Sequence, residues 1–562
     1  MKKIKVAFFD LTGCEGCQFQ LLSLDEHLFD FFQDFEITNW RLLSERKKSD
    51  FDIAVIEGAA TTEKHVKLLK EIRETSELVV ALGACAISGN VFAQLDPERR
   101  KEMAEKIYGP DYKLKAEFLE PVEKFVKVDK KIPGCPPRVD LFKSFLEEIK
   151  GQKITSKIKD VISPEYTAKI EGHGTLKINF KEKKADFEVE ESERLVEGLL
   201  QDKPFQQAPF ITSRICGICP IAHNVCSLSA LEKAFGIVPS REAILLRRIL
   251  LASQVIKSHL LHLFFLVLPD YAGLESSIEL SKKYPAEFHL MLNIKRVADH
   301  LLRVVGGSSA FPTNTVVGGF KNPPQRSHLA PVGASISEVM DEAEDLVKLF
   351  YDLETLDFQV SSKLSTTIPS ENFYPLYPGI VEQSFQSVSH NQSPVKLGRL
   401  ENGESIKVGA LARIEKYSDR LDPKAQKLLG RYKVDTKNPF FNNLAQAIEI
   451  FHFLEEIQDL IGELNKGNLQ KATSDFQRFP KARVSGEAYI EAPRGILRHF
   501  VEVEDGKVKS YQIITPTQLN LSSLYEEIQA LVKKDRLQEA EKKREIEKLI
   551  RAFDPCITCA VH

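Results

Sequence analysis

The first 150 residues alternate short apolar runs with amphipathic stretches. Three runs have the length and composition of buried strands, at 4–11, 51–58 and 77–85. A helical pattern follows the second run at 63–74, and another at 136–151 begins with proline and ends with glycine, as helix ends prefer. Strands that alternate with helices are typical of an α/β domain. We therefore predict a flavodoxin-like, doubly wound parallel sheet over this segment, residues 1–150.

A polar stretch at 151–165 interrupts the alternation, and we predict that it is a linker. Beyond it, a short β segment leads into long helical patterns, of which 241–268 is apolar on several faces, as in a buried helix. The charged run 533–548 is interpreted as a solvated helix face. Residues 166–562 are thus predicted to form a mainly α-helical domain with small β insertions. Further helices are expected around 290–304, 334–354, 441–464 and 523–552.

Composition and charge exclude several classes of protein. The 562 residues are 43% hydrophobic and 28% charged, which is a globular balance. With 77 basic and 80 acidic residues the formal net charge is −3, so no basic surplus points to nucleic acid. The longest uninterrupted apolar run, 263–268, is far too short to span a membrane, and the first residues lack a signal-peptide pattern. We expect a cytoplasmic protein with no membrane span.

Nine cysteines are too few for a disulfide scaffold, but six of them form three Cys-x-x-Cys pairs, which indicates metal or redox chemistry. One pair and one single cysteine lie at the ends of predicted strands of the first domain, where the carboxyl ends of parallel strands meet, and a second single cysteine lies in an analogous turn. We call them the sheet-edge thiols: Cys14, Cys17, Cys85 and Cys135. Four thiolates suit a cubane iron–sulfur cluster. A structural zinc site is the alternative, and a thioredoxin-like dithiol is weaker because it leaves two cysteines idle.

The second constellation joins distant parts of the chain. Two Cys-x-x-Cys pairs lie near the two ends of the second domain, and we call them the core thiols: Cys216, Cys219, Cys556 and Cys559. Two pairs so far apart in the sequence would make an inefficient structural zinc site. They could instead close both ends of the domain around one buried dinuclear centre, each pair supplying one terminal and one bridging thiolate. A ninth cysteine, Cys226, is interpreted as a packing residue.

These motifs resemble those of nickel–iron ([NiFe]) hydrogenases. The second domain resembles the large subunit, and the first resembles the small subunit with the cysteines of its proximal cluster. The resemblance covers nearly the whole chain and implies that the two subunits are fused in one polypeptide. The large-subunit motifs are Ile-Glu-Gly-His-Gly (170–174), Arg-Ile-Cys-Gly-Ile-Cys-Pro-Ile-Ala-His (214–223), Glu-Ala-Pro-Arg-Gly (491–495) and Asp-Pro-Cys-Ile-Thr-Cys-Ala-Val-His (554–562).

The resemblance implies a role for each matching position. The core thiols would hold nickel, and Cys219 and Cys559 would also bridge to an iron that carries CO and cyanide. Glu171 would take a proton from a terminal thiolate, expected to be that of Cys556, and Arg494 would face the open side of the centre. Pro493 and Thr517 would line the diatomic ligands, and His223 would contact a bridging thiolate. Glu197 and His562 would hold a Mg²⁺ or Fe²⁺ ion near the C-terminus.

The implied activity is the reversible oxidation of H2 to protons and electrons. Electrons would leave through one proximal [4Fe–4S] cluster to an acceptor protein or redox partner subunit, and maturation proteins would assemble the centre. The alternative is an iron–sulfur electron-transfer scaffold related to the respiratory quinone-reductase core, but that branch lacks the core thiols. Without the family, Arg494 would be interpreted as a buried ion-pair partner, Glu171 as a solvated carboxylate and His562 as a frayed terminus.

The chain departs from the family pattern at two places. The motif Gly-Gly-Arg-x-x-His-Pro reads Gly-Gly-Ser-Ser-Ala-Phe-Pro at 306–312, which removes polar contacts expected near the cluster. The usual aspartate beside the active-site arginine is replaced by Ser258, so Arg494 is expected to pair with Asp554 instead.

Overall fold

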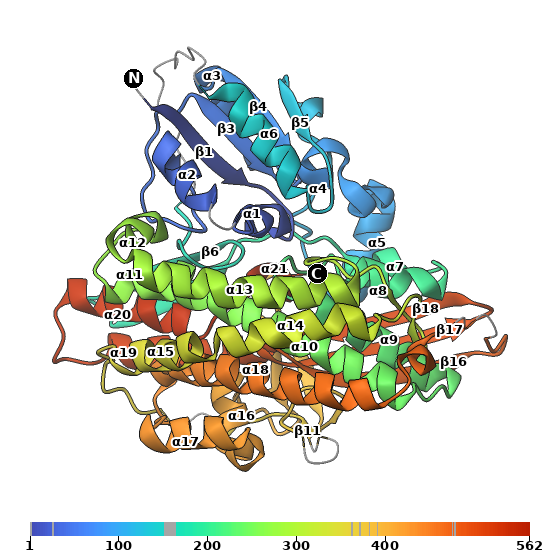
Figure 1. Cartoon of the computed structure of the whole chain (residues 1–562). Coiled ribbons are helices and arrows are strands. Elements are labelled where there is room, and N and C mark those ends of the chain that lie inside the picture. The colour runs from blue at the N-terminus through green and yellow to red at the C-terminus, as the bar shows by residue number, and fades with distance from the viewer. Residues whose placement is uncertain are drawn as a thin grey trace.

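A computed structural model describes residues 3–24, 27–150, 165–360, 363–369, 373–381, 383–390, 392–474, 476 and 479–561. The predicted linker lies, apart from its last residue, outside the described residues, and so does His562. The parallel sheet lies above a broad layer of long helices (Figure 1).

The N-terminal half contains a five-stranded parallel sheet with the order β2-β1-β3-β4-β5. This is the strand order of flavodoxin-like folds. Buried apolar residues point to both faces of β1: Val6 and Phe8 join the core that contains Phe142, whereas Phe9 joins the core that contains Leu69. The strands are Ile4–Asp10, Phe35–Asn39, Ile53–Glu57, Leu78–Leu82 and Lys130–Ile132.

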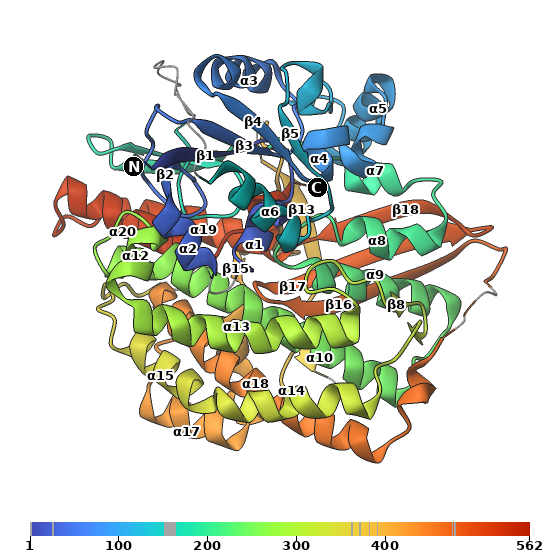
Figure 2. The same cartoon turned by 45° about the horizontal axis from the view of Figure 1, so that its top comes forward.

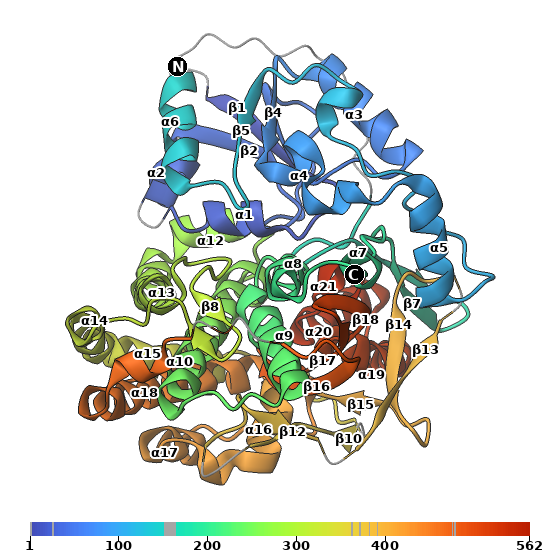
Figure 3. The ribbon, with the colours of Figure 1, turned by 90° about the vertical axis from the view of Figure 1, so that its right-hand side faces the viewer.

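Helices connect the strands and cover both faces of the sheet (Figure 3). They are α1 (Gly16–Leu21), α2 (His27–Asp34), α3 (Glu63–Thr75), α4 (Gly83–Ser88), α5 (Pro97–Tyr108) and α6 (Val139–Ile149). The three predicted strands and the helices at 63–74 and 136–151 are present. Strands β2 and β5 were not predicted, because both are short and carry polar residues.

The second half is dominated by packed helices. Its centre is α10, which continues through one π-helical segment into α11, so that one long helix spans Arg241–Tyr271. That helix is long and apolar enough to cross a bilayer, yet 94% of its most apolar window is buried inside the protein, as in the core helix of a folded domain. The helices around it are α9 (Pro220–Phe235), α13 (Pro285–Gly306), α14 (Arg326–Glu338), α15 (Met340–Tyr351) and α18 (Asn442–Lys466).

The largest β element of this half is an antiparallel meander that packs on α9. Its strands are β16 (Val484–Ala492), β17 (Gly495–Glu504) and β18 (Lys507–Ile514), and they belong to a five-stranded sheet. The sheet is larger than the small β insertions predicted from the sequence. Within the register, Ala492 pairs with Gly495, so the hairpin turn consists of Pro493 and Arg494 alone.

Two predicted helices are each divided in the structure. The pattern at 334–354 belongs to α14 and α15, and the pattern at 523–552 belongs to α19 (Pro516–Val532) and α20 (Glu539–Ala552). A polar turn separates the second pair. The charged run is not simply a solvated face, because Lys542, Glu545 and Ile546 are buried in α20.

The two halves of the chain lie against each other (Figure 2), and polar side chains such as Arg41, Glu15 and His173 are buried where they meet. The guanidinium of Arg41 is bound by the carboxylates of Asp10 and Glu15, and it donates to the carbonyl of Ile170 at 2.9 Å. His173 lies 2.7 Å from Asp10, with its other ring nitrogen 2.8 Å from Glu191. The ends of the parallel strands therefore face the loops that carry the core thiols.

Candidate metal centres

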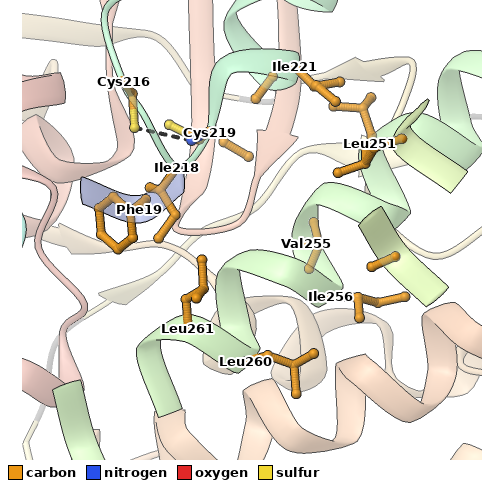
Figure 4. Close-up of a cluster of buried hydrophobic side chains, with 14 of the residues drawn as sticks. Phe19, Cys216, Ile218, Cys219, Ile221, Leu251, Val255, Ile256, Leu260 and Leu261 are labelled. Atoms are coloured by element: carbon orange, nitrogen blue, oxygen red, sulfur yellow. Dashed lines mark hydrogen bonds between the residues drawn. The ribbon is translucent and has the colours of Figure 1, made fainter. Parts of the chain in front are cut away.

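The core thiols converge in the interior although their two motifs lie far apart in the sequence. Cys216 Sγ and Cys556 Sγ are 3.4 Å apart, and the sulfur atoms of Cys216, Cys219 and Cys559 all lie within 4.8 Å of one another. All four are at most 4% exposed. The first pair precedes α9 and stands above a layer of apolar side chains (Figure 4), whereas the second flanks the start of α21 (Ile557–Ala560).

The backbone around Glu171 joins these two motifs. Its carbonyl accepts from Ile557 N at 2.9 Å, next to Cys556. Gly172 has a φ of +82°, and a Cβ added there would lie 2.7 Å from Thr558 N, so only glycine fits this approach. The Ile-Glu-Gly-His-Gly motif is therefore a clamp that holds the C-terminal pair in place.

The Glu171 carboxyl contacts the core thiols directly. Oε1 accepts from Cys216 Sγ at 3.3 Å and from Thr558 Oγ1 at 3.2 Å, while Oε2 is buried without a hydrogen-bond partner. Burial raises the pKa of Glu171 well above its usual range, the nearby charge of Cys556 raises it further, and Arg494 opposes both. The sequence did not anticipate the contact with Cys216.

Arg494 is fixed from two sides. Its Nε donates to Asp554 O at 2.7 Å and its Nη2 to Asp554 Oδ1 at 2.8 Å, while Nη2 lies 3.5 Å from Glu171 Oε2. Nη1 is buried and has no hydrogen-bond partner. The pairing with Asp554 agrees with the sequence prediction, and Ser258 is buried with its hydroxyl unpartnered. One end of a rigid guanidinium, Nη1, is thus left without a hydrogen bond.

The protonation of the core thiols differs among them. Burial raises the pKa of Cys216, Cys219 and Cys559 well above the usual range. Burial acts on Cys556 in the same direction, but hydrogen bonds from the other core thiols and the charge of Arg494 together lower its pKa well below that range. Among the core thiols, the surroundings thus favour the charged form most at Cys556, and ligand thiols release their protons when a metal binds.

A chain of hydrogen bonds supports Cys559. His223 Nε2 lies 3.0 Å from Cys559 Sγ, and His223 Nδ1 lies 3.1 Å from His499 Nε2. His499 in turn contacts the hydroxyl of Tyr511 at 2.9 Å. This chain fixes the His223 ring against the sulfur, a common arrangement behind metal ligands. Sequence reasoning missed His499 and Tyr511, whose only signal is their inward position on strands.

Thr517 lies beside the core thiols, whereas Pro493 precedes Arg494 in the turn between β16 and β17. Thr517 Oγ1 accepts from Cys556 N at 3.1 Å, which leaves its hydroxyl proton free. Pro493 O accepts from Arg413 Nη2 at 3.1 Å. Arg413 is buried and paired with Glu449 at 2.7 Å and with Glu491 at 2.9 Å. Sequence reasoning missed Arg413 because nothing in its local pattern distinguishes it from a surface arginine.

The sheet-edge thiols form a second site, in which Cys14 and Cys17 are buried while Cys85 and Cys135 are partly exposed. Their charges act on one another, and with burial as the larger cause they raise the pKa of Cys14 and Cys17 well above the usual range. Among the described cysteines, no three of these four sulfurs lie within 4.8 Å of one another. A zinc ion with Zn–S bonds of about 2.3 Å would need sulfurs about 3.8 Å apart. The wider spacing fits a cluster.

The surroundings of the sheet-edge thiols suit a compact cofactor. Gly83 has a φ of +85°, and a Cβ added there would lie 2.3 Å from Cys17 Sγ. Asn90 Nδ2 donates to Cys85 Sγ at 3.6 Å and to Cys135 Sγ at 3.4 Å, a contact missed from the sequence. Hydrogen bonds to thiolate sulfurs are a common means of tuning iron–sulfur clusters.

The two sites are joined through the backbone. Gly217, between the first two core thiols, donates its N–H to Cys14 O at 2.9 Å. A Cβ on Gly217 would lie 2.3 Å from the Cα of Gly16, so the two Cys-x-x-Cys loops are in direct contact. Electrons could therefore pass between the sites without crossing solvent.

Glu197 lies apart from both sites. Its Oε1 accepts from Ile513 N at 2.6 Å, and it lines a cleft of about 590 Å³ together with Lys396 and Ala560. A carboxylate near the C-terminus is a suitable Mg²⁺ ligand. The predicted partner, His562, lies outside the described residues.

The donor set of the core site fits a soft transition-metal centre. Four buried thiols in mutual contact suit nickel and iron. The unpartnered Glu171 Oε2 and Arg494 Nη1 are polar groups that a bound species could satisfy.

Comparison with known proteins agrees with this geometry. Residues 14–149 match the family "NADH ubiquinone oxidoreductase, 20 Kd subunit", and residues 194–289 and 402–562 match "Nickel-dependent hydrogenase". The chain is 32% identical over 436 residues to sulfhydrogenase 1 subunit alpha of Pyrococcus furiosus, an alignment that covers 71% of this chain and 97% of that relative. The N-terminal part is 33% identical over 153 residues to sulfhydrogenase 2 subunit delta of the same organism, covering 26% of this chain and 63% of the relative.

The chain therefore belongs to the nickel-dependent hydrogenases, and it is an oxidoreductase that acts on H2. Segments that match two separate sulfhydrogenase subunits are joined here in one polypeptide. The fold agrees with that of a solved NAD⁺-reducing [NiFe]-hydrogenase in the H2-reduced state, with a TM-score of 0.61 at 23% identity, covering 70% of this chain and 97% of that chain. The alternative of a scaffold without hydrogenase activity is left without support.

Proposed function

We propose that the protein catalyses the reversible heterolytic oxidation of H2 at a buried nickel–iron centre held by the core thiols, with electrons leaving through one [4Fe–4S] cluster held by the sheet-edge thiols. The observation that carries this proposal is the direct contact between the two sites, in which Gly217 N donates to Cys14 O at 2.9 Å. The loops that hold the catalytic centre and the iron–sulfur cluster would then be joined by a hydrogen bond.

Within this proposal, the core thiols are the metal ligands, and Cys219 and Cys559 are the bridging pair. When bound, a nickel–iron pair with CO and cyanide on the iron would supply the site at which H2 is polarised and split. His223 contacts Cys559 Sγ at 3.0 Å and would hold that sulfur in place. Pro493 and Thr517 would line the pocket for the diatomic ligands.

Proton transfer would begin at a terminal thiolate. Cys216 Sγ is 3.3 Å from Glu171 Oε1, and Cys556 also contacts this carboxyl, so a thiol proton has a carboxylate within direct reach. Arg494 would keep its free Nη1 toward the reacting face and stabilise negative charge there. Because Asp554 holds the guanidinium through two bonds, it would not need to reorient during turnover.

Electron transfer would proceed from the core site toward the surface. Cys85 and Cys135 are the partly exposed members of the sheet-edge thiols, so the outer side of the cluster faces a partner. The acceptor would be a redox protein or a partner subunit, as suggested by relatives that are named as subunits of sulfhydrogenases.

Two further parts of the proposal concern assembly. Glu197, with His562, would hold a Mg²⁺ or Fe²⁺ ion near the C-terminus, and maturation proteins would insert nickel and the iron fragment. Cytoplasmic localisation is part of the same proposal.

Infrared spectroscopy of anaerobically prepared protein tests the proposal. Metal-bound CO and cyanide absorb in a region free of protein bands, so bands there are expected together with nickel. Folded protein that contains nickel but shows no such bands would rule out the proposed centre. Nickel-free protein must first be matured, and its spectrum is compared only after nickel is present.

A further inference from the structure

Arg214 occupies an unusual position between the two sites. It follows α8 (Ala208–Thr212), two residues before Cys216, and is 5% exposed. Its guanidinium carbon lies 3.3 Å from the ring centroid of Phe210 and 4.7 Å from that of Phe311. Nη1 donates to Phe210 O at 2.6 Å and to Ser213 Oγ at 2.7 Å. Two aromatic rings thus shield this cation from water.

No carboxylate of the described chain lies within ion-pair distance of Arg214. Four other fully buried or nearly buried arginines each have one: Arg41 with Asp10, Arg247 with Glu232, Arg248 with Glu456 and Arg413 with Glu449. Burying a cation without a counter-ion is costly, so an anion is expected beside it.

The anionic partner of Arg214 is the cluster site. The guanidinium packs on Phe311, whose ring borders the loop of Cys14 and Cys17. Burial lowers the pKa of Arg214, and the thiols of Cys135 and Cys14 act in the opposite direction. Phe311 lies close to the loop between Cys14 and Cys17, because a Cβ added at Gly16 would be 3.5 Å from the Phe311 ring. Two other buried arginines lack a carboxylate and donate to backbone carbonyls: Arg100, and Arg194, whose charge lowers the pKa of Cys14 and Cys85 against the larger effect of burial.

We propose that Arg214 is a positioning residue that raises the reduction potential of the cluster. Uptake of one electron adds one negative charge to the cluster and its four thiolates, and a buried cation beside the loop of Cys14 and Cys17 stabilises that charge. The rings of Phe210 and Phe311 keep water away and so preserve the interaction. A higher potential makes the cluster a better acceptor of electrons from H2, which biases the enzyme toward H2 oxidation. The inference rests on the proposed cluster.

A redox titration of the cluster, followed by its electron paramagnetic resonance signal, tests this role independently of H2 turnover. Arg214→Gln is expected to lower the ratio of reduced to oxidised cluster at a fixed potential at least tenfold, which for one electron is 59 mV. Arg214→Lys should fall between wild type and Arg214→Gln. The matched control is Arg138→Gln, which removes an arginine three residues after Cys135. The Arg138 side chain is 79% exposed and paired with Asp140, so solvent screens its charge. The ratio of reduced to oxidised cluster in this variant should stay within about twofold of wild type.

The outcomes separate the inference from the function on which it rests. A wild-type protein without a reducible cluster signal contradicts the proposed function. An unchanged midpoint in Arg214→Gln that retains the full cluster overturns the role of Arg214. If Arg214→Gln loses the cluster, the variant Phe210→Ala serves as the test instead. The Phe210 ring is 46% exposed, and its removal admits water beside the guanidinium. The ratio of reduced to oxidised cluster should then fall as well, by a smaller factor than expected for Arg214→Gln. An unchanged ratio in Phe210→Ala also overturns the inference.

Discussion

Replacing Arg494 by lysine tests how the hairpin turn of β16 and β17 contributes to catalysis. The guanidinium makes two bonds to Asp554, at 2.7 and 2.8 Å, and its buried Nη1 still lacks a hydrogen-bond partner. A single ammonium group cannot keep both bonds and a third donor in the same geometry. The variant is therefore expected to retain its metals but lose most turnover.

The size of the loss follows from the type of contact removed. One preorganised donor at a reacting centre contributes about 100-fold or more to kcat. The weakened pairing with Asp554 removes a charged hydrogen bond, which costs about 1.5–3 kcal/mol of folding stability. Initial rates of H2-dependent dye reduction, normalised to nickel content and to the infrared bands, measure the first quantity. Thermal unfolding measures the second.

A matched control lies on the same hairpin. Arg498 is in β17, and its side chain is 19% exposed and paired with Glu487. Arg498→Lys should keep kcat within about twofold of wild type, since surface ion pairs contribute little. Wild-type turnover in Arg494→Lys, at full metal content, would refute the reasoning and remove Arg494 from the mechanism.

Three further predictions follow from the sites and their interface. Cys559→Ala should abolish H2 activity and nickel retention but leave the N-terminal cluster spectrum intact, as shown by metal analysis and electron paramagnetic resonance; loss of both signals would contradict independent sites. Gly83→Ala places a Cβ 2.3 Å from Cys17 Sγ and should greatly reduce cluster content per chain, with nickel as the internal reference. Burial alone would lower the pKa of His173, but the carboxylates of Glu191 and Asp10 raise that pKa to about 10. Because this pKa is raised in the folded state, the stabilisation of a few kcal/mol is present below about pH 6.5 and is lost as the pH rises toward 10; His173→Gln should flatten that decline in the melting temperature, and an unchanged pH profile would argue against the charged pair.

Much of the fold could be predicted from local patterns. The alternation of strand and helix signals over residues 1–150 indicated the parallel sheet, because strands buried on both faces are nearly continuous apolar runs. The β16–β18 meander was not predicted. Its strands carry charged residues on the solvated face, which weakens the apolar pattern of a strand. Their place in a five-stranded sheet also depends on pairing with β11 and β12, which is a tertiary contact.

The sequence by itself determined which residues can bind metal. Cysteine spacing specifies a ligand pair because two thiols three residues apart can reach one ion from a single turn, and the family motifs extended this to Glu171 and Arg494. Tertiary structure decided which of these ligands meet, how far apart the sulfurs lie, and which buried charges face them. His499 behind His223, Asn90 beside Cys135, and Arg214 on the ring of Phe311 became visible only in the fold. Their partners lie tens to hundreds of residues away, and no local pattern encodes a contact that depends on how separate elements pack.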